Sequence, residues 1–138
     1  KLIGTGEMLN FCKKFVKENH LEEHVLFEHE RPHEQINIFY NEIDLFVMPS
    51  YYEAFGCVYM EAWASNTPFI AIREQGISEV IPEKERKNLL AEEQSAESLK
   101  EKIWIAYNNR RSYPFDEKYD IKNTIYNFLS LDIFEKND

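Results

Sequence analysis

Hydrophobic residues along this chain gather in short continuous runs. The runs at 45–48 and 69–72 are apolar at every position, and shorter strand-like runs occur at 1–3, 25–27 and 88–91. Runs without alternation between polar and apolar residues are typical of strands that are buried on both faces of a parallel sheet. The pattern therefore predicts five strands, and it predicts two-sided burial for 45–48 and 69–72.

Between these runs, apolar residues recur at the spacing of amphipathic helices. The predicted helices cover 8–18, 32–40, 56–64, 77–81, 95–107 and 117–131, whereas the acidic segment 83–87 is expected to be a solvated loop. Ser95, together with Ser98, is expected to cap the start of the helix 95–107. Strands that alternate with helices predict an α/β protein with a Rossmann-like, doubly wound parallel sheet, formed as a single domain over 1–138.

A doubly wound sheet binds its ligands at the carboxyl ends of the strands. Three segments follow predicted strands and are expected to meet at that edge, namely 4–7, 31–34 and 50–56. These segments are the first place to look for functional residues.

Composition and charge restrict the class of partner. The chain has 138 residues, 43% of them hydrophobic, and this suffices for the core of one domain. Its formal net charge of −9 argues against nucleic acid or an anionic membrane surface as partner. Cys12 and Cys57 lack zinc-ligand spacing, so we expect reduced core thiols in a cytoplasmic protein and no metal site. Because Lys1 falls within a strand, we expect the chain to be a piece of a longer protein.

A glycine-rich turn, Gly4-Thr5-Gly6, lies between the first predicted strand and the first predicted helix. Such a turn is typical of phosphate binding, because the free N–H groups at the start of a helix attract anions. However, Leu9 replaces the third glycine of a dinucleotide-binding fingerprint, and the lysine of a P-loop is absent. A tight turn without any ligand explains the two glycines equally well.

The segment 49–61 carries the strongest candidate chemistry. A buried strand ends, a polar loop follows, and a helix starts near Gly56, where free N–H groups and the lack of a Cβ let a diphosphate approach. Glu53 precedes this start. Glu61 lies about a turn and a half into the helix, but its carboxylate is expected to reach back to the start because helical side chains lean toward the N-terminus. Two carboxylates beside a diphosphate need neutral donors, and the vicinal hydroxyls of a ribose or hexose supply them. Alternatively, Glu53 caps the helix and Glu61 is an ordinary surface residue.

This segment resembles the signature of the retaining GT-B glycosyltransferases of the glycosyl transferases group 1 family. The residues that carry the resemblance are Pro49-Ser50, Glu53, Phe55-Gly56, Glu61-Ala62, Ala64 and Pro68-Phe69-Ile70-Ala71, with seven residues between the two glutamates. The Gly-x-Gly start, the proline-containing loop after 25–27 and Gly76-x-x-Glu79-Val80-Ile81 are similar too, so that the resemblance covers roughly residues 1–110. It implies the C-terminal, donor-binding half of a GT-B fold.

The resemblance also implies roles for individual residues. Glu53 is expected to be the catalytic residue that contacts hydroxyls of the donor sugar, and Glu61 is expected to bind the ribose hydroxyls. The other expected substrate-binding residues are Gly4 and Gly6 in the first turn, Arg31 and Pro32 at the nucleobase, Phe55, Gly56, Cys57 and Val58 at the diphosphate or sugar, and Gln75 and Gly76 in the next loop.

Three positions depart from the family pattern. Ala54 stands where glycine is usual and modestly narrows its loop. Gln75 replaces the first of a usual pair of glycines and puts close approach of a ligand to the backbone there in doubt. Asn66 stands where a glycine often ends the helix, and asparagine tolerates the left-handed conformation there. The resemblance further implies a first strand, an arginine and lysine pair and an N-terminal acceptor domain, all expected before Lys1.

The function implied by the resemblance is transfer of a hexose-type sugar from a UDP- or GDP-sugar to a glycan hydroxyl, with retention and without a metal cofactor. The full-length protein is expected to lie at the membrane periphery, and this chain alone is expected to be inactive. An alternative stays open, namely a non-catalytic Rossmann-like interaction domain that no longer binds nucleotide. Net charge −9, with only Arg31 and Arg73 near the proposed pocket, favours this alternative somewhat.

Overall fold

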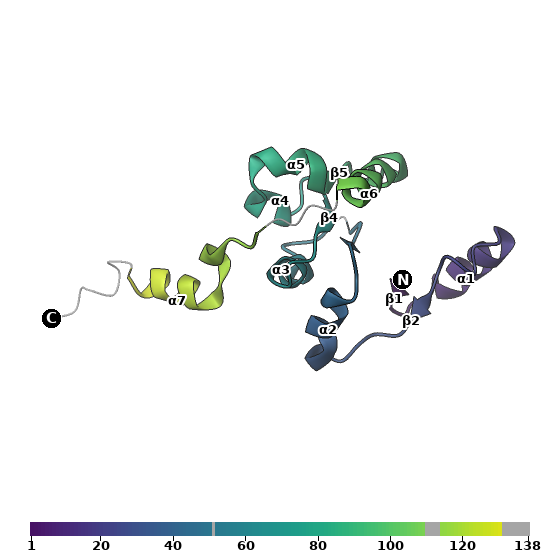
Figure 1. Cartoon of the computed structure of the whole chain (residues 1–138), viewed down its shortest axis with the longest axis horizontal. Coiled ribbons are helices and arrows are strands. Elements are labelled where there is room, and N and C mark those ends of the chain that lie inside the picture. The colour runs from purple at the N-terminus through teal and green to yellow at the C-terminus, as the bar shows by residue number, and fades with distance from the viewer. Residues whose placement is uncertain (51, 110–113, 131–138) are drawn as a thin grey trace. The chain divides into compact units, whose positions relative to one another are not determined.

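The structure is a computed structural model that describes residues 1–50, 52–109 and 114–130, apart from the side chain of Phe128. Strands and helices alternate along it (Figure 1). In chain order, with η for a 3₁₀ helix, the elements are β1 (Leu2–Ile3), α1 (Leu9–Glu18), β2 (Phe27–Glu28), η1 (His33–Gln35), α2 (Ile36–Asn41), β3 (Phe46–Val47), α3 (Cys57–Ala64), β4 (Phe69–Ile72), α4 (Ile77–Val80), α5 (Glu83–Leu89), β5 (Leu90–Ala91), α6 (Ala96–Asn109), η2 (Glu117–Tyr119) and α7 (Ile121–Leu129).

The chain divides into two compact units, Lys1–Ile36 and Asn37–Asp138. In the first unit, β1 and β2 form a parallel pair in which Leu2 lies opposite Phe27. The N–H of Gly4 donates to the carbonyl of Glu28 at 3.2 Å and so continues the pairing beyond β1. This unit therefore supplies a short parallel sheet followed by glycine-rich and proline-containing loops.

In the second unit, β3, β4 and β5 form a parallel sheet with β4 in the centre. All four residues of β4 are buried. Ile70 and Ile72 pack with residues of α6, whereas the ring of Phe69 contacts the rings of Tyr59 and Trp63 in α3, at centroid distances of 5.4 and 6.3 Å. Because alternate residues of a strand point to opposite faces, α6 covers one face of this sheet and α3 the other. The predicted α/β class with parallel strands is confirmed. The predicted two-sided burial holds for β4 but not for residues 45–48, which are only partly buried.

The helix α5 corrects one prediction, because the segment 83–87 is helical and not a solvated loop. Pro82 precedes the helix, two acidic residues lie in its first turn and two basic residues lie in its last turn, an arrangement that the helix dipole stabilises. Leu89 alone is buried. A helix that buries a single residue lacks the apolar stripe on which sequence-based helix prediction depends.

Other boundaries differ by smaller amounts. The second strand lies at Phe27–Glu28 and not at 25–27. The predicted helix 117–131 is divided into η2 and α7 at Asp120, whose ψ of 137° is extended, and residue 131 lies outside the described residues. The two thiols are free, as expected, but Cys57 is exposed and Cys12 is only partly buried, so the prediction that they are core residues was wrong.

Candidate functional site

The predicted site residues follow strands in both units. In the first unit, the segment 4–7 follows β1 and 31–34 follows β2. In the second unit, 50–56 follows β3 and 73–76 follows β4. Because the strands within each sheet are parallel, the segments of each unit lie at the carboxyl edge of that unit's own sheet, which is where α/β proteins bind ligands.

In the turn after β1, both glycines adopt backbone conformations that other residues rarely take. The φ angles are 132° at Gly4 and 142° at Gly6. A Cβ built at either residue would meet no atom within 4 Å, so conformation and not space requires glycine here. The backbone N–H of Leu9 donates to the carbonyl of Gly6 at 3.1 Å and begins α1. A phosphate-binding turn and a tight turn without a ligand both fit this geometry.

Arg31, expected at the nucleobase, forms an ion pair within the first unit. Its Nη2 donates to Oε2 of Glu28 at 2.9 Å, and Lys1 lies 3.2 Å from the other carboxylate oxygen. The Arg31 guanidinium, and then Lys1, hold the pKa of the Glu28 carboxyl below its ordinary value. Pro32 is exposed and lies at the N-cap of η1. The predicted contacts of Arg31 and Pro32 with a base stay predictions.

Helix α3 starts at Gly56, which is buried and left-handed, with φ 72° and ψ 72°. A Cβ at Gly56 would lie 2.6 Å from the ring of Tyr59 and 3.0 Å from Cγ of Glu53. Glycine is therefore required both by the conformation and by the space. Glycine at the N-cap has no side chain to cap the helix. The N–H of Tyr59 donates to the carbonyl of Gly56 at 2.9 Å, so the N–H groups that precede Tyr59 are the ones that a ligand can use. Phe55 and Cys57 beside them are exposed, and Val58 is partly buried.

The loop that carries Glu53 is held by the start of α4. The side-chain oxygen of Gln75 accepts hydrogen bonds from the backbone N–H groups of Tyr52 at 3.0 Å and Glu53 at 2.8 Å. The N–H of Gly76 donates to the carbonyl of Glu53 at 3.5 Å, and a Cβ at Gly76 would overlap the carbonyl oxygen of Ala54. Gln75 therefore fixes the backbone of Glu53, and its predicted contact with a ligand stays a prediction.

Glu61 is held by Tyr40, a residue that sequence reasoning did not place in the site. The Tyr40 hydroxyl donates to the backbone carbonyl of Val58 at 3.0 Å and to Oε2 of Glu61 at 3.2 Å. One hydroxyl reaches both acceptors, so the Glu61 carboxylate lies back along the first turn of α3. The only sequence signal for this contact is the position of Tyr40 at the end of the predicted second helix.

Glu53 lies at the same helix start. Its Cγ is close to Gly56. The hydroxyl of the neighbouring Tyr59 donates to the carbonyl of Met48 at 2.6 Å. Burial, and to a smaller extent the charge of Glu53, raise the pKa of Tyr59 to about 12. The predicted pair of glutamates therefore flanks the first turn of α3.

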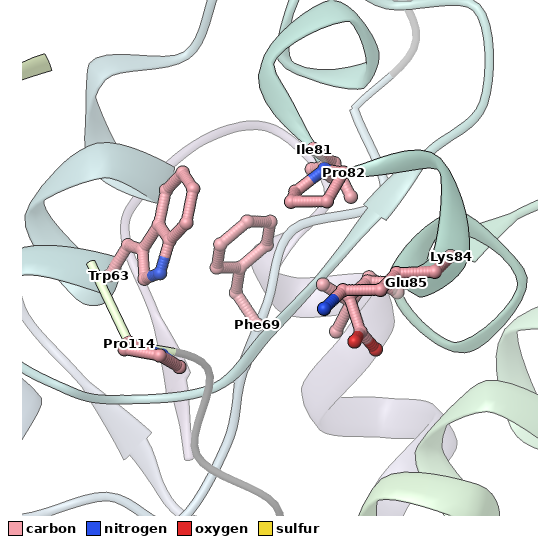
Figure 2. Close-up of a pocket in the computed structure, with 8 residues that line it drawn as sticks. Trp63, Phe69, Ile81, Pro82, Lys84, Glu85 and Pro114 are labelled. Atoms are coloured by element: carbon pink, nitrogen blue, oxygen red, sulfur yellow. The ribbon is translucent and has the colours of Figure 1, made fainter. Parts of the chain in front are cut away.

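A cavity of about 120 Å³ lies elsewhere in the second unit (Figure 2). It is lined by Trp63, Phe69, Ile81, Pro82, Lys84, Glu85, Leu89 and Pro114. Phe69 is the first residue of β4 and Trp63 lies in the last turn of α3, and neither Glu53 nor Glu61 lines this cavity. Its lining is mostly apolar and carries no convergent set of polar groups.

Other candidate ligands are engaged or exposed. Arg73 forms a partly exposed ion pair with Glu92 at 2.9 Å. His33 is exposed in η1. Over residues 1–50, 52–109 and 114–130 there is no group of three or more His, Cys, Asp or Glu side chains that could hold a metal ion. Within the same described part, none of the helices combines the length and apolar character needed to cross a membrane.

The family model described as "Glycosyl transferases group 1" matches residues 1–124. The chain belongs to this family. The match extends beyond the segment 1–110 covered by the resemblance found in the sequence. A relative named as an uncharacterised glycosyltransferase of Methanocaldococcus jannaschii is 34% identical to this chain over 109 residues. The aligned segment covers 79% of this chain and 30% of that protein.

Two further comparisons agree with this assignment. A D-inositol 3-phosphate glycosyltransferase of Corynebacterium efficiens is 37% identical over 65 residues, covering 47% of this group 1 chain and 15% of that protein. The structure of a sucrose-phosphate synthase from Thermosynechococcus elongatus superposes with a TM-score of 0.72 at 24% identity, covering 99% of this chain and 38% of that one. This likeness shows the GT-B type of fold. The chain spans less than a third of the length of the curated relatives described here.

Proposed function

We propose that this chain is the donor-binding part of a glycosyltransferase that uses a nucleoside diphosphate sugar. The observation that carries the proposal is that Glu53 and Glu61 flank the uncapped start of α3 around Gly56. The helix start offers N–H donors and partial positive charge to a diphosphate, and each carboxylate offers acceptors to hydroxyls. Family membership supports the same reading.

In the proposed complex, the residues act by binding and orientation. Glu61 accepts hydrogen bonds from the ribose hydroxyls, and Glu53 accepts them from hydroxyls of a hexose. The N–H groups from Phe55 to Val58 hold the diphosphate or sugar. Gly76 keeps the loop close to the ligand, and Gln75 holds that loop. We propose UDP or GDP as the nucleotide.

The proposed reaction is transfer with retention of configuration. The bond between the anomeric carbon of the sugar and the diphosphate oxygen breaks, a bond from that carbon to an acceptor hydroxyl oxygen forms, and the hydroxyl proton is released. The diphosphate leaves with additional negative charge, and the helix start stabilises this charge by electrostatics, without a metal cofactor in the proposal. Acceptor binding, by a glycan in the proposal, falls to a different domain of the full-length protein.

Isothermal titration calorimetry with UDP and with GDP tests the proposal. We expect the wild-type chain to bind at least one of them, and Glu61→Ala to weaken that binding about tenfold, because hydrogen bonds to a charged acceptor are lost. Glu101→Ala, at an exposed glutamate in α6, is the matched control and should bind like wild type. Equal affinity in wild type and Glu61→Ala would remove the ribose-binding role, and no binding to either nucleotide would favour the non-catalytic alternative.

A further inference from the structure

Tyr40 combines deep burial with a hydroxyl that is directed at the candidate site. The residue lies in the last turn of α2 and is only 3% exposed. Its hydroxyl carries one proton, and that proton is shared between the carbonyl of Val58 and Oε2 of Glu61. Tyr40 is therefore the group that ties a carboxylate on the second turn of α3 to the backbone of the first turn.

The position of Tyr40 is itself held from several sides. The Thr67 hydroxyl, which is buried, donates to the backbone carbonyl of Tyr40 at 2.8 Å. The Tyr40 ring packs edge-on against the ring of Phe46 in β3, with centroids 5.5 Å apart and an interplanar angle of 81°. A side chain fixed by α2, by β3 and by the segment after α3 has little freedom to turn.

The protonation of Tyr40 suits a permanent hydrogen-bond donor. Burial, and then the negative charge of Glu61, raise the pKa of the Tyr40 phenol well above its ordinary value. The hydroxyl therefore keeps its proton throughout the physiological pH range and donates at all times.

We infer that Tyr40 is a positioning residue whose hydroxyl orients the Glu61 carboxylate for a ribose diol and thereby favours ribonucleotides over 2′-deoxyribonucleotides. This inference rests on the proposed function. A carboxylate has about four acceptor sites, so the single bond from Tyr40 leaves enough of them for two ribose hydroxyls. Because Tyr40 already holds one oxygen, the carboxylate does not have to be ordered when the diol binds, and the conformational entropy lost on binding is smaller.

The test compares Tyr40→Phe with wild type by calorimetry, using UDP, GDP and their 2′-deoxy forms with the 138-residue chain. Phenylalanine keeps the ring and removes only the hydroxyl. We expect the affinity for the ribonucleotide to fall about fivefold, and that for the 2′-deoxy form to fall less, so that the ratio of the two affinities drops at least twofold.

Tyr59→Phe is the matched control, because it also removes a buried hydroxyl bond but one that ends on a backbone carbonyl. A purely structural loss, as in this control, should lower the thermal midpoint without changing the ratio. In Glu61→Ala the ratio should already be low, and adding Tyr40→Phe to it should lower the ratio no further, because the two changes act through one carboxylate.

The outcomes separate the two hypotheses. If Glu61→Ala weakens ribonucleotide binding but Tyr40→Phe leaves the ratio at its wild-type value, the inference about Tyr40 is wrong and the proposed function stands. If the wild-type chain binds none of the nucleotides, or if Glu61→Ala binds like wild type, the proposed role of Glu61 fails and the inference fails with it.

Discussion

At the scale of single residues, Gly76 shows how the absence of a side chain brings two loops together. The carbonyl of Ala54 occupies the space where a Cβ would lie, and the conformation of Gly76 is an ordinary helical one. Glycine is therefore required here by close contact alone. The contact involves only the backbone of Ala54, whose side chain is exposed, so an alanine side chain at this position does not interfere with it.

We predict that Gly76→Ala destabilises the chain by about 1–3 kcal/mol, because the added methyl group displaces the loop that carries Glu53. Urea unfolding measures the change, and nucleotide affinity should fall in parallel. Glu79→Ala on the same helix should change stability by less than about 0.5 kcal/mol. A stable Gly76→Ala variant with unchanged midpoint would show that the loop does not depend on this contact.

At the scale of elements, the ends of helices follow sequence signals closely. Asn66 adopts the left-handed conformation expected for it, with φ 59°, and the N–H groups of Asn66 and Thr67 donate to the carbonyls of Trp63 and Ala62. This is the pattern by which a left-handed residue ends a helix. The cap predicted for α6 is also present, since the Ser95 hydroxyl accepts from the N–H of Ser98 at 3.1 Å.

Ser95→Ala should therefore destabilise the chain by about 1 kcal/mol through loss of the cap of α6. Ser95→Thr keeps an acceptor oxygen and should stay close to wild type. Chemical denaturation of the three proteins gives the comparison. An equal loss in both variants would assign the effect to local packing and not to the hydrogen bond.

Elements also set the limit of prediction from sequence. Strand β4 was placed correctly because all four of its residues are apolar, and buried strands of a parallel sheet need apolar residues on both faces. Helix α5 was not predicted, because Leu89 is the only residue that it buries. Elements whose stability depends on a strong local pattern are visible in the sequence, whereas elements that depend on a single tertiary contact are not.

At the scale of the whole molecule, large apolar side chains remain exposed. Trp104 and Tyr107 stack on each other in α6 yet are 66% and 64% exposed, and Ile121 of α7 is 67% exposed. Trp63, by contrast, is buried in the core of the second unit. Of these three aromatic residues, the structure therefore places Trp63 in the core and leaves Trp104 and Tyr107 exposed.

We predict that the 138-residue chain binds nucleotide but does not transfer sugar, because the family resemblance assigns most acceptor contacts to another domain. Release of UDP or GDP from hexose donors, in the presence of glycan acceptors, provides the assay. Nucleotide binding by calorimetry is the control for a competent fold. Sustained turnover by the purified chain would contradict the prediction.

The sequence by itself determined the family, the alternation of strands and helices, and the two glutamates around Gly56, since these depend on local pattern and on residue types at set spacings. Only the tertiary structure decided what holds the glutamates. Tyr40 reaches Glu61 from 21 positions away, and Gln75 reaches the N–H of Glu53 from 22 positions away. Such contacts leave no periodic trace in the sequence, because they exist only once β3 and β4 lie side by side and bring α2, α3 and α4 to their places around the sheet.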